Sequence, residues 1–190
     1  ASATPAAAQA LVRNISYQNT DTDAPTTGAR TVRFVLTDGD GGTSANHDAT
    51  VTVSGVNDDP VNTVPGSIAV TEDVATALTG ISIADVDAGG ASMLVTLSAP
   101  TGSIAATTGG GVTVGGTSSA RTLTGTATNI NAFIAASNVT YTTAADANGS
   151  VTLTVLTSDQ GNTGSGGTLT DSDTVTLNIT AVNDAPVLAT

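Results

Sequence analysis

Short runs in which apolar and polar residues alternate make up most of the chain. Such runs are typical of β-strands with one buried face, because successive side chains of a strand point to opposite sides of the sheet. Capped helical turns are predicted at 5–12 and 128–135. The predicted strands of the last two thirds of the chain, of which 111–126 is long enough for two, are 67–71, 79–84, 93–98, 111–126, 138–143, 150–157 and 173–180. About seven strands at this spacing predict an all-β fold, a Greek-key β-sandwich. The four aromatic residues, Tyr17, Phe34, Phe133 and Tyr141, are expected in the core.

The sequence also repeats itself. Ala10–Tyr17 resembles Ala132–Tyr141, Thr31–Asp38 resembles Val151–Asp159, and Val51–Pro60 resembles Val175–Pro186. Three matches in the same order, about 125 residues apart, indicate a tandem repeat. The expected parts are the C-terminal half of a first repeat at 1–58, a linker at 59–66, a complete repeat at 67–184 and the start of the next linker at 185–190.

The half repeat at 1–58 supplies only the last strands of a sandwich. Such a fragment leaves an apolar face and a strand edge uncovered. Two explanations stay open at this point. Either a preceding repeat completes the sandwich, or a neighbouring copy donates the missing strands and the chains assemble by strand addition.

Composition removes several classes of function. Sixteen acidic residues against four Arg give a net charge of -12, which repels nucleic acid and anionic membranes. No segment approaches the length of a membrane-spanning helix and no leader opens the chain, so we expect a mature or excised soluble piece. The absence of Cys and the single His47 leave no thiolate site and no site with several imidazoles. His47 lies among polar residues without a nucleophile turn, and only four aromatic residues are present to line a sugar cleft, so we expect no enzyme.

The direction of the predicted strands brings acidic residues from both repeats to one junction near Pro60. The half repeat contributes its penultimate loop and the end of its last strand, and the complete repeat contributes two of its loops. The residues concerned are Asp21, Asp23, Asn57, Asp58, Asp85, Asp87 and Asp159. Carboxylates about 4 Å apart repel by about 1 to 4 kcal/mol per pair near a protein surface. Calcium, which takes about six to eight oxygen ligands in flexible geometry, is the cation best suited to offset this repulsion.

These motifs resemble those of a known family. Asn57-Asp58-Asp59-Pro60, followed by Asp85-Val86-Asp87, is similar to the linker and DxD elements of cadherin repeats. Val182-Asn183-Asp184-Ala185-Pro186 is similar to the linker of cadherin-like and VCBS-type repeats in large bacterial surface adhesins. The resemblance covers nearly the whole chain. It implies cadherin-like, immunoglobulin-like sandwiches stacked end to end, with Ca²⁺ between them, in a secreted or cell-surface parent protein.

The resemblance also implies metal ligands. Asn57, Asp58, Asp85 and Asp87 match the linker and DxD motifs, Asp21 and Asp23 stand at the position of an acidic pair, and Asp159 matches an acid that closes a strand. Glu72 resembles the Glu that follows the first strand, and it would join Asp146, Asn183 and Asp184 at the next junction. Asp146-Ala147-Asn148 departs from the acidic pair of the family, which implies fewer or weaker ions there.

The expected function is that of a calcium-rigidified structural extender repeat of a bacterial cell-surface adhesin or extracellular fibre. Its expected partners are adjacent repeats of the same chain or neighbouring copies. Two alternatives stay open: a calcium-dependent, lectin-like module that binds polysaccharide, and a filament subunit assembled through the half repeat. Asp38-Gly39-Asp40 is either a solvated turn or half of another calcium site, and we expect turn caps at Asp48, Asp171 and Asp173.

Overall fold

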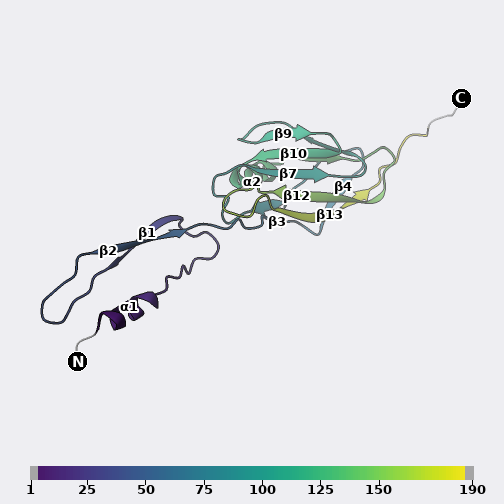
Figure 1. The fold of residues 1–190 in the computed structure, drawn as a ribbon. Coiled ribbons are helices and arrows are strands. Elements are labelled where there is room, and N and C mark those ends of the chain that lie inside the picture. The colour runs from purple at the N-terminus through teal and green to yellow at the C-terminus, as the bar shows by residue number, and fades with distance from the viewer. Residues whose placement is uncertain (1–3, 187–190) are drawn as a thin grey trace. The chain divides into compact units, whose positions relative to one another are not determined.

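A computed structural model of the chain describes residues 4–186. The chain forms two compact units, unit 1 (residues 1–55) and unit 2 (residues 56–190). In the described part of the chain far more residues lie in β-strands than in helices (Figure 1), which confirms the prediction of a β-rich protein. Of the linker expected at 185–190, residues 187–190 lie outside the described part. No helix in the described part is long and apolar enough to cross a membrane.

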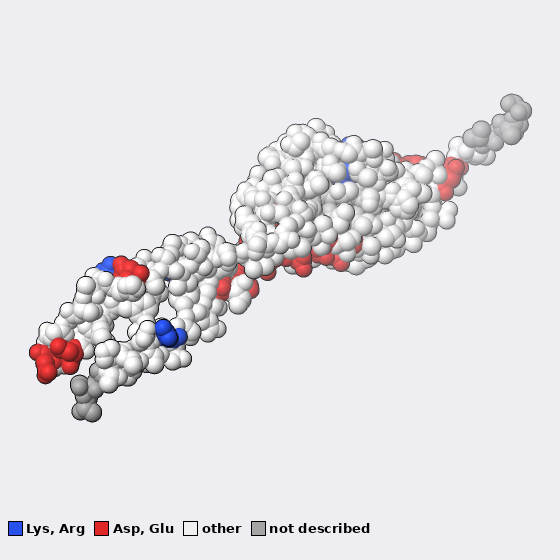
Figure 2. All heavy atoms as spheres, in the orientation of Figure 1, with Lys and Arg blue, Asp and Glu red and all other residues white. Residues whose placement is uncertain are grey.

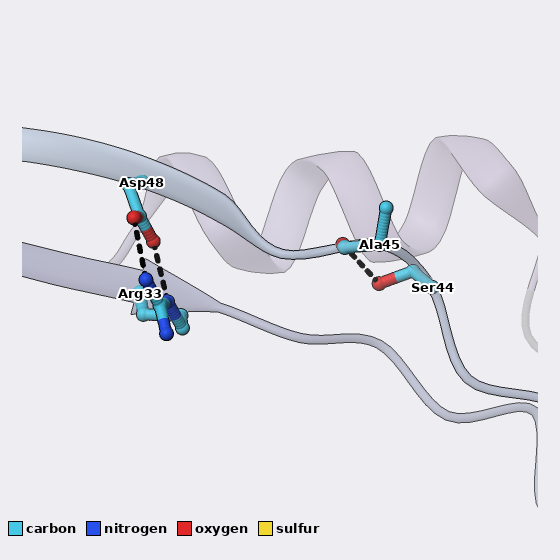
Figure 3. Close-up of polar contacts among 4 residues, drawn as sticks. All are labelled: Arg33, Ser44, Ala45 and Asp48. Carbon is cyan, nitrogen blue, oxygen red and sulfur yellow. Dashed lines mark hydrogen bonds and ion pairs between the residues drawn. The ribbon is translucent and has the colours of Figure 1, made fainter.

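Unit 1 contains one helix and one hairpin. Helix α1 (Pro5–Arg13) begins at Thr4, whose hydroxyl accepts a hydrogen bond from the amide of Ala7. Strands β1 (Gly28–Phe34) and β2 (His47–Val53) pair antiparallel. An exposed ion pair joins Arg33 to Asp48 across the hairpin, with 2.7 Å from Nε to Oδ1 (Figure 3). The sequence predicted a turn cap at Asp48, and this prediction was wrong. Asp48 lies within β2 and forms an ion pair with Arg33 on the neighbouring strand.

Residues 4–55 of unit 1 form no hydrophobic core. None of its described residues is buried, and Leu11 and Leu36 are 70% and 59% exposed. A groove of about 760 Å³ runs between α1 and the hairpin, and Leu11, Val12 and Phe34 are among the residues that line it. Residues 4–55 thus present an apolar face that no other described residue of unit 1 covers. That unit 1 is half of a sandwich stays a prediction.

Unit 2 contains two larger sheets, a two-stranded pair and a helix. Its elements are β3 (Val61–Thr63), β4 (Ser67–Thr71), β5 (Thr76–Ala77), β6 (Ser82–Ala84), β7 (Met93–Ser98), β8 (Ser103–Ala106), β9 (Thr113–Gly116), β10 (Ala120–Gly125), α2 (Ala127–Ala135), β11 (Val139–Thr142), β12 (Gly149–Ser158) and β13 (Thr170–Thr180). The six-stranded sheet has the order β4-β13-β12-β7-β10-β9 and the three-stranded sheet the order β5-β11-β8, while β3 pairs with β6. All pairings are antiparallel except that of β4 with β13.

A single hydrophobic core holds the sheets of unit 2 together. Leu153 and Leu177 of the six-stranded sheet and Tyr141 of the three-stranded sheet are fully buried in it. Helix α2 adds Ile130, Phe133 and Ile134, and the Thr126 hydroxyl accepts the amide of Asn129 at its start. Burial of Phe133 and Tyr141 confirms two predicted core aromatic residues.

The other two aromatic residues, Tyr17 and Phe34, were also expected in a core, and this prediction was wrong. Tyr17 is 49% exposed and Phe34 is half-buried. Both lie in unit 1, which lacks the strands that cover their matched positions in unit 2.

The β1-β2 hairpin of unit 1 and the β12-β13 hairpin of unit 2 share one register. Gly28 of β1 lies opposite Val53 of β2, and Gly149 of β12 lies opposite Ile179 of β13. In both units a Val-Asn-Asp triplet begins three residues after that partner, at Val56 and at Val182. If Val53 is aligned with Ile179, the two sequences therefore match without a gap from the end of the last strand to the Val-Asn-Asp triplet.

Candidate metal centres

Five residues lie close together where the chain enters unit 2, and we call them the N-terminal cluster. They are Asn57, Asp58, Asp85, Asp87 and Asp159. Asn57 and Asp58 lie a few residues before β3, Asp85 and Asp87 follow β6, and Asp159 follows β12. On the visible face of unit 2 acidic side chains gather along one side, and basic side chains are nearly absent (Figure 2). The cluster thus has few cations nearby to offset its charge.

Backbone amides hold the carboxylates of this cluster in place. The amide of Asp58 donates to Oδ2 of Asp87 at 3.2 Å. Oδ1 of Asp85 accepts the amides of Asp87 and Ala88 at 3.1 and 3.0 Å, which closes the turn after β6. The segment before β3 and the turn after β6 are thereby tied to each other.

Four oxygen atoms of the cluster are buried and accept no hydrogen bond. They are Oδ1 of Asn57, Oδ2 of Asp58, Oδ2 of Asp85 and Oδ1 of Asp87. A buried polar atom without a partner costs about 1 to 3 kcal/mol, and more when it is charged. All four atoms can only accept, so each is able to bind a hydrogen-bond donor or a cation. A donor set made solely of oxygen suits a hard cation such as Ca²⁺.

Burial and hydrogen bonds shift the pKa values of two carboxylates of the cluster in opposite directions. Burial raises the pKa of Asp85, and the hydrogen bond and negative charge of Asp87 raise it further. Burial also acts to raise the pKa of Asp159, but hydrogen bonds from Gly161, Asn57 and Leu169 outweigh it and lower that pKa. Asp159 is therefore a stable anion, whereas Asp85 lies where a second carboxylate opposes its ionisation.

Asp159 differs from the other expected ligands because its oxygens already have donors. Oδ1 accepts the amides of Gly161 and Leu169, both at 2.8 Å, and Oδ2 accepts the side-chain amide of Asn57. Asp159 thus orients Asn57 in this structure.

Asp21 and Asp23 lie in unit 1, where both are exposed. Oδ1 of Asp21 accepts the amide of Ala24 at 3.3 Å, and Oδ1 of Asp23 accepts the hydroxyl of Thr22 at 2.9 Å. Their expected contribution to the N-terminal cluster stays a prediction.

A second group, which we call the C-terminal cluster, contains Glu72, Asp73, Asp146 and Asp184. Glu72 directly follows β4 and is 1% exposed. Its Oε2 accepts the amide of Val182 at 2.8 Å, while its buried Oε1 has no partner. Partial desolvation raises the pKa of Asp184, and the charges of Glu72, Asp146 and Asp73 raise it further. The structure thus brings three of the expected residues into mutual influence.

Two residues at this end differ from the sequence prediction. Asp73 was missed, although it follows Glu72 directly and lies in a turn with a positive φ of 59°. Asn183 was expected as a ligand, but it is exposed and its side-chain amide donates at 3.4 Å to the carbonyl of Asp184. Its role in binding stays a prediction.

Neither cluster is a closed cage. Within residues 4–186 no group of three or more His, Asp or Glu side chains is arranged so that it holds a metal ion as it stands. Of the four buried oxygens without donors in the N-terminal cluster, three belong to carboxylates and one to an amide.

Two other acidic residues, Asp38 and Asp171, accept hydrogen bonds from nearby backbone amides. Oδ1 of Asp38 accepts the amides of Asp40 and Gly42, both at 2.9 Å, which lowers its pKa and forms a turn between β1 and β2. The expected turn caps at Asp171 and Asp173 were wrong, because both residues lie within β13. Oδ2 of Asp171 instead accepts the amide of Asn62 at 2.7 Å and ties β13 to β3.

The chain was compared with known proteins. No protein-family model matches it, and no curated protein matches it at a significant level.

Proposed function

We propose that the chain is a calcium-rigidified structural extender repeat of an extracellular fibre or bacterial cell-surface adhesin. The observation that carries this proposal is the set of four buried, donorless oxygens in the N-terminal cluster. In the proposal, unit 2 is a Greek-key sandwich of cadherin-like type, and its partners are adjacent repeats or neighbouring copies.

The two ends of unit 2 are built on the same principle. A carboxylate of Asp87 accepts the amide of Asp58, and a carboxylate of Glu72 accepts the amide of Val182. Each carboxylate grips the backbone of a linker with one oxygen and leaves the other oxygen buried without a donor. A residue that binds both the linker and a cation would make the stiffness of the linker depend on that cation.

A bound calcium ion supplies two positive charges and room for several oxygen ligands. Asn57, Asp58, Asp85 and Asp87 would hold it at the N-terminal end, and Glu72, Asp146 and Asp184 would hold it at the other. The linker residues would then lose their freedom to move independently of unit 2. Sites of extracellular type bind at about 10⁻⁴ to 10⁻³ M calcium, so they fill outside cells and empty in the cytosol.

Calcium should raise the thermal stability of the chain, and EDTA should reverse the effect. At a free calcium concentration of 100 times Kd, each ion adds about 2.7 kcal/mol to the free energy of unfolding. Magnesium should have a much smaller effect, because it holds its waters and demands an octahedral site. Calorimetric titration and thermal unfolding measure both effects. Identical unfolding curves in calcium and EDTA would contradict the proposal.

A second candidate function is supported by unit 1. Its apolar groove and its lack of any buried described residue favour a filament subunit in which strands from a neighbouring copy cover this face. Sedimentation velocity of the wild type should then show concentration-dependent oligomers. The variant Leu36→Ser, on the open face, should reduce them about tenfold, as expected for loss of a buried contact of about 1.4 kcal/mol. The control Leu156→Ser, on an exposed position of β12, should not. A strictly monomeric wild type excludes this candidate.

A further inference from the structure

The loop between β12 and β13, residues 159–169, closes over the segment that enters unit 2. We propose that this loop, which we call the clasp, holds Val56 and Asn57 on unit 2 in the absence of calcium and thereby places the Asn57 side-chain oxygen in the N-terminal cluster. The part of this proposal that concerns calcium affinity rests on the proposed function. The part that concerns attachment of the linker to unit 2 rests on the contacts alone.

The tip of the clasp binds both the backbone and the side chain of the linker. Val56 pairs with Ser165 in an isolated parallel β-bridge, and the amide of Asn57 donates to the carbonyl of Ser165 at 2.9 Å. The side-chain amide of Asn57 donates to the carbonyl of Gly167 at 2.8 Å. Asn57 is only 5% exposed as a result. Together with the hydrogen bond to Asp159, these bonds use every donor of Asn57 and leave its Oδ1 as the atom without a partner.

The base of the clasp is anchored at three places. Oδ1 of Asp159 accepts two amides of the loop and closes it on itself. The side chains of Gln160 and Asn162 both donate to the carbonyl of Ser92, at 3.0 and 2.8 Å. The hydroxyl of Thr163 donates to the carbonyl of Asp87 at 2.8 Å. The clasp is therefore fixed to the same turn that carries two of the donorless carboxylates.

Gly164 is the residue that allows this close approach. A Cβ at this position would lie 2.7 Å from the amide nitrogen of Asn57 and 2.7 Å from the carbonyl carbon of Val56. Both are backbone atoms, so the linker would have to leave the clasp. Gly167 offers a matched comparison, because it also has a positive φ of 84° but a Cβ there would meet no atom within 4 Å.

The clasp gives the N-terminal cluster a ligand that is in place before any ion arrives. Ordering a free linker residue costs conformational entropy, and a linker already held on unit 2 has met that cost in folding. The clasp thus positions Asn57 without contacting the ion, and its loss should weaken calcium binding and leave the number of ions unchanged.

Hydrogen exchange of the full chain in EDTA tests the clasp by NMR. The Asn57 amide of the wild type should be protected, and Gly164→Ala should speed its exchange by about tenfold or more, as expected for local opening. Gly167→Ala should keep the protection, since it adds strain without a collision. Amides of β12 and β13 report whether each variant is folded, and these should stay protected in both variants.

Calcium titration of the same variants provides the second readout. Gly164→Ala should weaken binding at the N-terminal cluster by about tenfold, and Gly167→Ala should bind nearly as the wild type does. A wild type that binds no calcium refutes the proposed function, while the exchange experiment still judges the clasp. The clasp is overturned if the Asn57 amide of the wild type exchanges as fast in EDTA as that of Gly164→Ala, or if both glycine variants behave alike.

Discussion

Replacing Asp85 and Asp87 together with Asn should remove most of the stabilisation by calcium. These residues carry two of the four buried oxygens that lack donors in the N-terminal cluster. Loss of one ion at 100 times Kd removes about 2.7 kcal/mol, which corresponds to a fall in Tm of about 10 °C for a unit of this size. Thermal unfolding in saturating calcium measures the fall.

The same double variant should be at least as stable as the wild type in EDTA at pH 7. The pKa of Asp85 is raised in the folded chain, so folding favours its protonated form. Its contribution to stability is present below the unfolded pKa near 3.8 and is lost as pH rises through the raised value, which leaves a cost at neutral pH. An amide carries no charge and avoids that cost. Asp59→Asn, an exposed change in the same linker, is the matched control, and a double variant with the full calcium response would refute the site.

Replacing Glu72 with Gln should remove calcium from the C-terminal cluster and leave the N-terminal cluster loaded. Gln keeps the shape of Glu72 and an oxygen for the amide of Val182, but it removes the buried charge. We expect one ion fewer by calorimetric titration and a loss of about 2.7 kcal/mol in calcium at 100 times Kd. Asp40→Asn, in an exposed turn of unit 1, controls for the change in net charge.

The pH dependence of this variant separates its electrostatic effect from its effect on packing. The pKa of Asp184 is raised by desolvation and partly by Glu72, so its contribution to the stability of the metal-free wild type falls as pH rises above about 4. In Glu72→Gln one of these causes is gone, and the fall should be smaller. Chemical unfolding in EDTA between pH 4 and 7 measures it. An unchanged pH profile would show that Glu72 and Asp184 do not interact.

Much of unit 2 could be predicted from alternation alone. The segments 67–71 and 93–98 are strands with the predicted bounds, and 111–126 resolves into β9 and β10. Strand β8 was missed because Ser103–Ala106 contains mainly small residues and shows no large apolar alternation. Strands β3 and β5, with three and two residues, are too short to give a periodic signal.

Unit 1 shows that an alternating pattern does not by itself determine whether a strand forms. Tyr17 belongs to a segment that matches β11, yet residues 14–17 form no strand. In unit 2 the matched strand is paired on both sides by β5 and β8, for which the described part of unit 1 has no counterpart. Alternation marks residues able to form a strand, whereas partners decide whether the strand forms.

The direction of the predicted strands was enough to group the carboxylates of the clusters. It was not enough to predict the loop that holds Asn57 beside them. The sequence grouped Asp85 and Asp87 with the linker, and the structure joins Asp87 to Asp58 by a hydrogen bond. The glycine-rich composition of residues 161–167 predicts a loop and nothing more specific. The requirement for Gly164 depends on an approach to residues more than 100 positions away, and no local pattern records such an approach.

The parallel pair of strands β4 and β13 has a mechanical consequence. Ser67–Thr71 of β4, near the entrance to the unit, runs alongside Thr176–Thr180 of β13, near its exit, in the same direction. A pull on the two ends drags these strands past each other, so the hydrogen bonds between them bear the load in shear and must break together. Peeling them apart one by one would need far less force. Tension along the chain thus meets its main resistance in that five-residue patch.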